Sequence, residues 1–183
     1  MERDIERILI PQDALARRVR ELAGQISVSY GDPAGDIAIV SILSGAIIFL
    51  ADLIRYMPMK MKIGLITVSS YHGATTESRG AKLMKDLNVD VRGRDVLIID
   101  DIFDTGQTLR LVQGLLRERQ PRSLKTAVLL RKPAKAPPDV KVDFVGFDIE
   151  DVFVVGYGLD YNDHYRNYPH IAVLRPELYT GTG

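Results

Sequence analysis

One stretch of the sequence decides the expected fold: Val-Leu-Ile-Ile-Asp-Asp-Ile-Phe-Asp-Thr-Gly-Gln-Thr-Leu at residues 96–109. The four apolar residues at 96–99 predict a buried strand. Three carboxylates follow within five positions, at Asp100, Asp101 and Asp104. A short loop with hydroxyls and a glycine then leads into a predicted helix. Acids at a strand end and free amides at a helix N-terminus favour a ligand that carries both hydroxyl and phosphate groups.

The rest of the chain alternates between strand and helix patterns. Apolar residues at Leu15, Val19, Leu22 and Ile26 recur at helical spacing, and Pro11 suits the start of that helix. Further patterns predict strands at 37–40, 61–68, 126–130, 144–147 and 153–155, a loop at 41–46, a largely buried helix at 47–56 and another at 109–116. We therefore predict an α/β fold with a mainly parallel, twisted sheet that is flanked by helices on both faces.

In parallel sheets, ligands bind beyond the carboxyl ends of the strands. This pattern places Asp100, Asp101 and the loop at 104–108 there. Two simpler explanations are a solvated strand end and a turn in which Asp104 and Thr105 cap the helix. Adjacent carboxylates repel, however, and destabilise the fold unless a ligand, a cation or protons offset the repulsion. We therefore interpret the acid cluster as functional.

Composition narrows the class of protein. Of the 183 residues, 46% are hydrophobic, which suits one domain with a sizeable core. Lys plus Arg and Asp plus Glu number 24 each, so no basic excess indicates a nucleic-acid or anionic-membrane partner. The absence of cysteine excludes disulfides, thiolate metal sites and cysteine nucleophiles. The charged N-terminal residues and the lack of an apolar run of about 18 residues predict a cytoplasmic protein without a membrane partner.

Several segments resemble a known family. Residues 100–108 resemble the phosphoribosyl-pyrophosphate loop of the type I phosphoribosyltransferases. Others are similar to hypoxanthine-guanine phosphoribosyltransferases: Leu43-Ser44-Gly45-Ala46, Ser70-Tyr71, Arg131-Lys132, and 143–166 with Phe-Val-Val-Gly-Tyr-Gly-Leu-Asp-Tyr at 153–161. The resemblance implies a type I phosphoribosyltransferase fold in a single domain over 1–183. A small hood subdomain is expected from the N-terminal segment and residues from about 150 to 183.

The resemblance also implies a reaction in purine salvage. A 6-oxopurine, hypoxanthine and/or guanine, displaces pyrophosphate from C1 of 5-phosphoribosyl-1-pyrophosphate and gives IMP and/or GMP. Magnesium (Mg2+) is implied as the cofactor, because a hard cation neutralises the pyrophosphate leaving group. A homodimer or homotetramer is the expected assembly.

The donor half of the reaction maps onto the opening stretch. In the family the loop Asp104-Thr105-Gly106-Gln107-Thr108 wraps the 5-phosphate, with Gly106 allowing close backbone approach. Asp100 and Asp101 match the pair that faces the ribose hydroxyls and the metal. Asp104 matches the general base for the purine N7 proton; it can also stabilise a cationic transition state.

Further positions match contacts to the pyrophosphate and the metal. Leu43, Ser44 and Gly45 match a pyrophosphate-binding turn that often contains a non-proline cis peptide bond, although many relatives have a lysine in place of Ser44. Arg166 resembles a bidentate pyrophosphate contact, and Asp160 matches an aspartate that helps to hold a metal. Without the resemblance, Arg166 is an ordinary surface arginine and Asp160 a loop acid.

The acceptor half maps onto later residues. Lys132 resembles the lysine that donates to the purine 6-oxo group, which disfavours the amine of adenine. Phe153 matches the aromatic residue that stacks on the purine, and Val154 the residue whose backbone contacts the base edge; Asp160 lies in the same purine-binding segment. Without the resemblance, Lys132 is a solvated lysine and Phe153 belongs to the core.

The polar segment at 69–80 is the candidate lid. Ser70 and Tyr71 match the family's lid pair, and closure would keep water from the reactive ribosyl centre. Three alternatives remain open from the sequence. They are a phosphoribosyltransferase for xanthine or a pyrimidine, a same-fold RNA-binding regulator of pyrimidine genes, and an aspartate-phosphorylated receiver domain.

Overall fold

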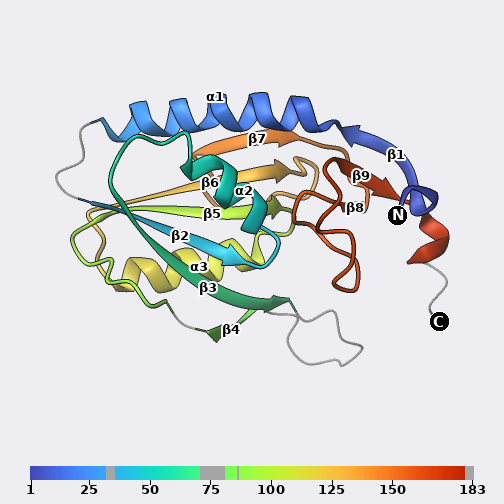
Figure 1. Ribbon diagram of the computed structural model, residues 1–183. Helices are drawn as coiled ribbons and strands as arrows, with labels where there is room; N and C mark the ends of the chain where they lie inside the picture. The colour runs from blue at the N-terminus through green and yellow to red at the C-terminus, as the bar shows by residue number, and fades with distance from the viewer. Residues whose placement is uncertain (32–35, 71–80, 86, 180–183) are drawn as a thin grey trace.

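The computed structural model describes residues 1–31, 36–70, 81–85 and 87–179 (Figure 1). In chain order the elements are η1 Glu2–Asp4, β1 Ile5–Ile10, α1 Gln12–Tyr30, β2 Ile37–Leu43, α2 Ile47–Ile54, β3 Met61–Ser70, β4 Ala81–Lys85, β5 Asp95–Phe103, α3 Gln107–Glu118, β6 Ser123–Arg131, β7 Phe144–Asp148, β8 Val154–Val155, β9 Ile171–Leu174 and η2 Pro176–Leu178.

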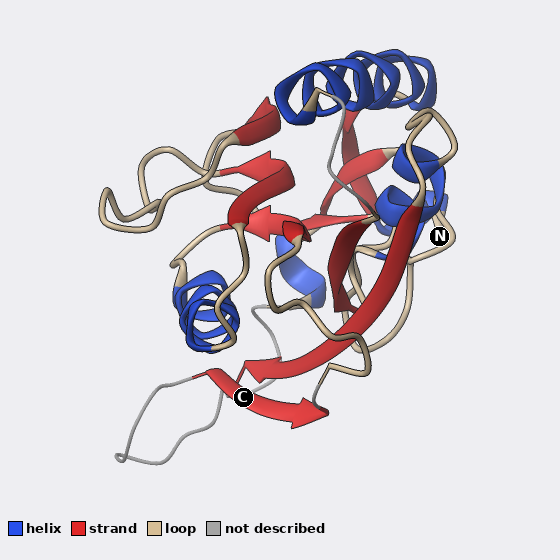
Figure 2. Cartoon of the chain, turned by 90° about the vertical axis from the view of Figure 1, so that its left-hand side faces the viewer, coloured by secondary structure: helices blue, strands red, loops and turns tan. Residues whose placement is uncertain are grey.

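Six strands form the central sheet, in the order β4-β3-β2-β5-β6-β7. All neighbours pair in parallel except β4, which is antiparallel to β3. Helices α1 and α2 lie on one face and α3 on the other (Figure 2). Alternate strand residues serve the two faces, so Ile39 and Leu97 pack in the first core and Val40 and Ile98 in the second. The predicted α/β fold with a mainly parallel sheet is confirmed.

Strand β5 is longer than predicted. The sequence placed its end at Ile99, with the acids after it, but β5 continues to Phe103 and contains Asp100 and Asp101. The reason is the ladder with β6, which continues as far as the pair Phe103–Arg131. Pairing with β2, in contrast, ends at Ile99. The two acids therefore lie on a strand segment that has lost one neighbour, at the carboxyl end of the sheet.

Two other expectations are corrected. The predicted loop at 41–46 is partly strand, because residues 41–43 pair with β3 as far as Leu43–Thr67. Helix α2 ends at Ile54 and is buried on one side only: Phe49 and Leu53 are in the core, whereas Ile47 and Ile48 are 46% and 37% exposed. Asp52 is the single charged residue of this helix, so the sequence shows no polar stripe that would signal the asymmetry.

A second sheet lies beyond the carboxyl ends of the parallel strands (Figure 1). It has the order β1-β9-β8 and is antiparallel throughout. Strand β1 comes from the first residues of the chain, and β8 and β9 from the last part. The two ends of the sequence thus meet beside the opening of the central sheet.

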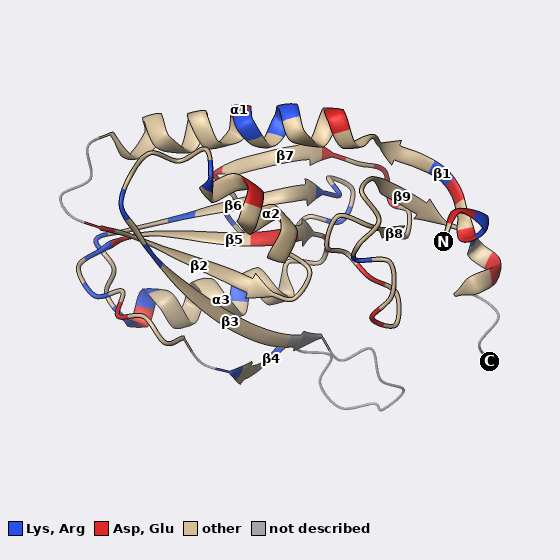
Figure 3. Ribbon diagram, in the orientation of Figure 1, with Lys and Arg blue, Asp and Glu red and all other residues tan. Residues whose placement is uncertain are grey.

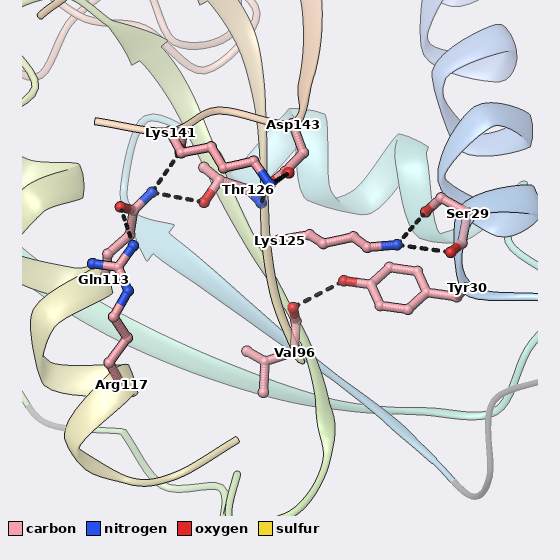
Figure 4. Close-up of polar contacts among 9 residues, drawn as sticks. All are labelled: Ser29, Tyr30, Val96, Gln113, Arg117, Lys125, Thr126, Lys141 and Asp143. Carbon is pink, nitrogen blue, oxygen red and sulfur yellow. Dashed lines mark hydrogen bonds and ion pairs between the residues drawn. The ribbon is translucent and has the colours of Figure 1, made fainter. Parts of the chain in front are cut away.

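Charges of both signs are interspersed along the ribbon, and α1 carries both in the half that follows β1 (Figure 3). No helix within the described ranges is long and apolar enough to cross a membrane. At the amino-terminal edge of the sheet, Lys125 donates to the carbonyl of Ser29 near the end of α1 over 2.7 Å, and the Tyr30 hydroxyl donates to the Val96 carbonyl over 2.9 Å (Figure 4). These contacts fasten α1 to the sheet at the edge away from the acids.

Candidate active site

A cavity of about 1050 Å³ opens between the carboxyl ends of β2 and β5 and the second sheet. It collects every predicted site residue except the lid pair: Leu43, Ser44, Gly45, Asp100, Asp101, Asp104, Thr105, Gly106, Gln107, Thr108, Lys132, Phe153, Val154, Asp160 and Arg166. Ser70 ends β3, and its side chain and the whole of Tyr71 lie outside the described residues. Apolar residues that the sequence did not single out complete the lining: Ile42, Val68, Ile102, Phe103, Leu109 and Leu159.

The loop before α3 has the geometry of an anion cradle. Gly106 precedes the helix in the left-handed conformation with φ of 73°, and a Cβ there would lie 2.7 Å from Pro137 Cγ. No side chain caps the helix, so the explanation of Asp104 and Thr105 as capping residues is wrong. The residues of the first turn of α3, whose amides have no partner within the helix, line the cavity.

The two acids in β5, Asp100 and Asp101, have raised pKa values. Asp100 is 4% exposed, and its Oδ1 accepts from the Asp101 amide over 3.1 Å. Burial, with the Asp101 charge added, raises the pKa of Asp100 well above its usual range. Burial also raises the pKa of Asp101, and the charge of Asp160 acts in the same direction. Asp100, Asp101 and Asp160 all line the cavity, so their negative charges face the same space.

The turn after β2 lies directly against these acids. The peptide bond between Leu43 and Ser44 is cis, at the position where the resemblance implied such a bond. A Cβ on Gly45 would overlap the carboxylate of Asp101, and a Cβ on Gly158 would overlap the carbonyl of Gly45. The backbone of this turn is therefore enclosed between β5 and the segment that follows β8, and a side chain at position 45 would displace the Asp101 carboxylate.

Lys132 follows β6 and is not a solvated lysine. Its side chain is 9% exposed, and its Nζ lies 3.2 Å from both Asp104 Oδ2 and Asp151 Oδ1. Lys135 Nζ lies 2.9 Å from Asp151 Oδ1 and 3.9 Å from Asp104 Oδ1. Asp151 and Lys135 were not predicted as site residues from the sequence. The only signal for them was a second lysine three positions after Lys132 and an acid two positions before Phe153.

Phe153 is 37% exposed at the cavity rather than a core residue. Tyr179 stacks on it with a centroid distance of 4.9 Å, and Tyr161 meets it edge-on at 5.7 Å. Val154, the next residue, is fixed in β8 by its pairing with Val173. The aromatic ring therefore stands at the cavity wall directly before β8, in contact with two tyrosines that the sequence did not reveal.

Arg166 is held rather than free at the surface. Its Nη1 lies 2.8 Å from Asp160 Oδ1 and donates to the Gly158 carbonyl over 2.9 Å, and its Nη2 lies 2.9 Å from Asp163 Oδ1. The Asp160 carboxylate also accepts from the Asp163 amide. A guanidinium with a fixed orientation at the cavity wall suits recognition of a phosphate group.

These features define the class of the protein, and comparison with known proteins agrees. Residues 8–162 match the family model described as "Phosphoribosyl transferase domain". The chain belongs to the phosphoribosyltransferase family, and the family assignment and enzyme class predicted from the sequence are confirmed.

Within this family, the chain is similar to enzymes that are named for hypoxanthine or guanine. The chain is 43% identical over 179 residues to the hypoxanthine-guanine phosphoribosyltransferase of Bacillus subtilis, covering 98% of both chains. It is 42% identical over 165 residues to the hypoxanthine phosphoribosyltransferase of Escherichia coli, covering 90% of this chain and 93% of the relative. A crystal structure of a hypoxanthine phosphoribosyltransferase from Staphylococcus aureus superimposes with a TM-score of 0.90 at 38% identity, covering 98% of this chain and 96% of that one.

Proposed function

We propose that this protein transfers the 5-phosphoribosyl group from 5-phosphoribosyl-1-pyrophosphate to hypoxanthine or guanine, a purine salvage reaction that gives IMP or GMP. One observation carries the proposal. A single cavity joins the anion cradle and acid pair of β5 to a lysine and an exposed aromatic ring next to the second sheet. The names of the relatives support this reaction over transfer to xanthine or a pyrimidine, over RNA binding and over a receiver domain.

The donor binds on the central sheet in this proposal. The amides at the start of α3, with Thr105, Gly106, Gln107 and Thr108, surround the 5-phosphate. Asp100 and Asp101 accept hydrogen bonds from the ribose hydroxyls. The turn at 43–45 and Arg166 contact the pyrophosphate.

Asp104 is proposed as the base in the transfer step. A ring nitrogen of the purine forms a bond to C1 while the bond from C1 to the pyrophosphate oxygen breaks, and the purine N7 proton passes to the Asp104 carboxylate. Asp104 Oδ1 is buried and accepts no hydrogen bond from the described residues, whereas Oδ2 faces Lys132. The carboxylate charge also stabilises positive charge that develops on the ribose. Replacement by asparagine is expected to lower kcat far more than donor binding.

Magnesium fits the acids of this site. Asp100, Asp101 and Asp160 supply carboxylate oxygens whose repulsion a hard cation relieves. The described residues contain no cluster of three or more His, Cys, Asp or Glu side chains placed to enclose a metal. This agrees with magnesium, which usually binds one or two carboxylates together with substrate phosphates. When bound, it would neutralise charge on the pyrophosphate leaving group.

The purine is proposed to stack on Phe153, with its 6-oxo group toward Lys132 and its edge toward the backbone of Val154. An ammonium donates and cannot accept, so the amine of adenine meets an unfavourable partner. The second sheet would serve as the hood of a single domain. The lid pair, the homodimer or homotetramer and the cytoplasmic location stay predictions.

The test is pyrophosphate release from the donor with magnesium and, in turn, hypoxanthine, guanine, xanthine, adenine and uracil. Release is expected with hypoxanthine or guanine and is expected to stop when the metal is chelated. Lys132→Met should lose turnover with the 6-oxopurine, whereas Lys125→Met changes a lysine near the other end of β6 and should retain it. No release with any base would refute the proposed reaction.

A further inference from the structure

Two carboxylates from different segments hold the ammonium of Lys132. Asp104 reaches it from the loop after β5 and Asp151 from the turn before β8, and each oxygen lies 3.2 Å from Nζ. The backbone amide of Lys132 donates to the Phe103 carbonyl over 3.0 Å, which fixes the start of the side chain. Because an ammonium has three donors, two carboxylates leave one for a ligand.

Lys135 balances the charge of this arrangement. The amides of Lys135 and Ala136 donate to the Lys132 carbonyl over 3.0 and 2.9 Å, and this turn places the two ammonium groups on the same side. Lys135 Nζ reaches Asp151 at 2.9 Å. Two lysines and two aspartates then form a quartet of zero formal charge. The pKa of Asp151 is lowered, first by Lys135 and then by Lys132.

Removal of either outer member changes the position of the inner lysine. Without Asp151, Asp104 alone attracts the Lys132 ammonium and draws it toward the proposed base. Without Lys135, one cation faces two carboxylates in a partly buried site, which is costly. Neither Asp151 nor Lys135 lines the cavity, so both act through Lys132.

We propose that Asp151 and Lys135 are positioning residues that fix the Lys132 ammonium against the 6-oxo group of the purine and thereby set discrimination against 6-aminopurines. This inference rests on the proposed function. It assigns the selectivity for the purine to an ion pair outside the cavity lining.

The experiment compares Asp151→Asn, Lys135→Met and Lys135→Arg with the wild type. Glu150→Gln is the matched control, because it removes a carboxylate from the same turn that pairs instead with Arg7 at 2.7 Å. The measurements are kcat, the KM values for hypoxanthine and for the donor, and the ratio of the adenine inhibition constant to the hypoxanthine KM.

Asp151→Asn is expected to raise the hypoxanthine KM about tenfold, a change of about 1.4 kcal/mol, and to lower the selectivity ratio by a similar factor. The donor KM should stay within about twofold, since the groups proposed to contact the donor do not change. Lys135→Met should act in the same direction, and Lys135→Arg should restore the wild-type ratio.

Outcomes separate this inference from the proposed function. A wild-type protein that releases no pyrophosphate refutes the reaction itself. An active wild type in which Asp151→Asn behaves like Glu150→Gln overturns the inference, as does an equal rise in the KM values for donor and hypoxanthine. If Asp151→Asn does not fold, Lys135→Met decides, because the Lys135 side chain is 44% exposed.

Discussion

The buried carboxyl of Asp100 makes the stability of the molecule depend on pH. Its folded-state pKa lies above the usual 3.8, first because of burial and then because of Asp101. The folded state therefore keeps a proton that the unfolded chain releases, and this contribution falls as the pH rises from about 3.8 through the folded pKa. Asp100→Asn cannot ionise. It should raise the free energy of unfolding at pH 7 above that of the wild type and abolish transfer.

Urea unfolding between pH 4 and pH 8 measures this effect, and the gain should shrink toward pH 4. Asp139→Asn is a control of opposite sign: Arg110 lowers the pKa of Asp139, so its contribution is present at neutral pH and is lost on acidification. A gain for Asp100→Asn that does not vary with pH would contradict the argument.

Gly45 is the second position where a single residue decides activity. The Asp101 carboxylate occupies the space in which a Cβ at position 45 would lie. Gly45→Ala should cost about 1–3 kcal/mol of stability through overpacking and at least about a hundredfold in kcat/KM, since displaced catalytic groups cause losses of that order. Thermal unfolding and pyrophosphate release measure the two. Gly24→Ala, in α1 with open space around it, should instead stabilise by about 0.5–1 kcal/mol.

At the scale of elements, a buried amide ties α3 to the loop before β7 (Figure 4). Gln113 is 3% exposed and donates to Thr126 Oγ1 over 3.0 Å and to the Lys141 carbonyl over 2.7 Å. Gln113→Leu has similar size but leaves both acceptors without this donor. Loss of about 1–3 kcal/mol in urea unfolding is expected, with unchanged kcat/KM because the network lies outside the cavity lining.

Gln25→Leu supplies the comparison, because Gln25 is an exposed glutamine of α1. It should change stability by less than about 0.5 kcal/mol. Equal losses for the two leucine variants would show that the Gln113 contacts contribute little.

An element whose apolar residues recur at a regular spacing could be predicted from the sequence. The pairing of strands that lie far apart in the chain could not. The stripe at Leu15, Val19, Leu22 and Ile26 predicted α1, which the structure places at Gln12–Tyr30, because burial of one face is encoded locally. Strands β1 and β9 were missed because each is paired with a segment at the other end of the chain. The extension of β5 through Asp100 was missed because its cause is the ladder with β6.

The site residues also divide into those that the sequence predicts and those that only the tertiary structure brings into the site. Residues 100–108 are contiguous, so their role in binding phosphate and hydroxyl groups could be inferred from the sequence. The resemblance to the family located Lys132 and Phe153. Asp151 and Tyr179 were missed because each becomes significant only through a tertiary contact, with Lys132 and Phe153 respectively. Lys135 was missed because it joins the site through its contact with Asp151. No spacing in the sequence places an acid of the turn before β8 within 3.2 Å of a lysine after β6.

At the scale of the whole molecule, the cavity belongs to neither sheet alone. The central sheet contributes Asp100, Asp101 and the phosphate loop, and the segments joined to the second sheet contribute Phe153 and Arg166. A ligand that contacts both parts should therefore link them and stabilise the fold more than one that contacts the phosphate loop alone.

Inosine and adenosine monophosphates test this linkage, because they share the ribose phosphate and differ at the 6-position. Inosine monophosphate at about 100 times its Kd should raise the Tm by about 5–10 °C, and adenosine monophosphate at the same concentration should raise it less. In Lys132→Met the two shifts should become equal, since the group that distinguishes oxo from amino is gone. Scanning calorimetry measures both. Equal shifts in the wild type would mean that the base does not reach Lys132, and that the phosphate loop alone holds the nucleotide.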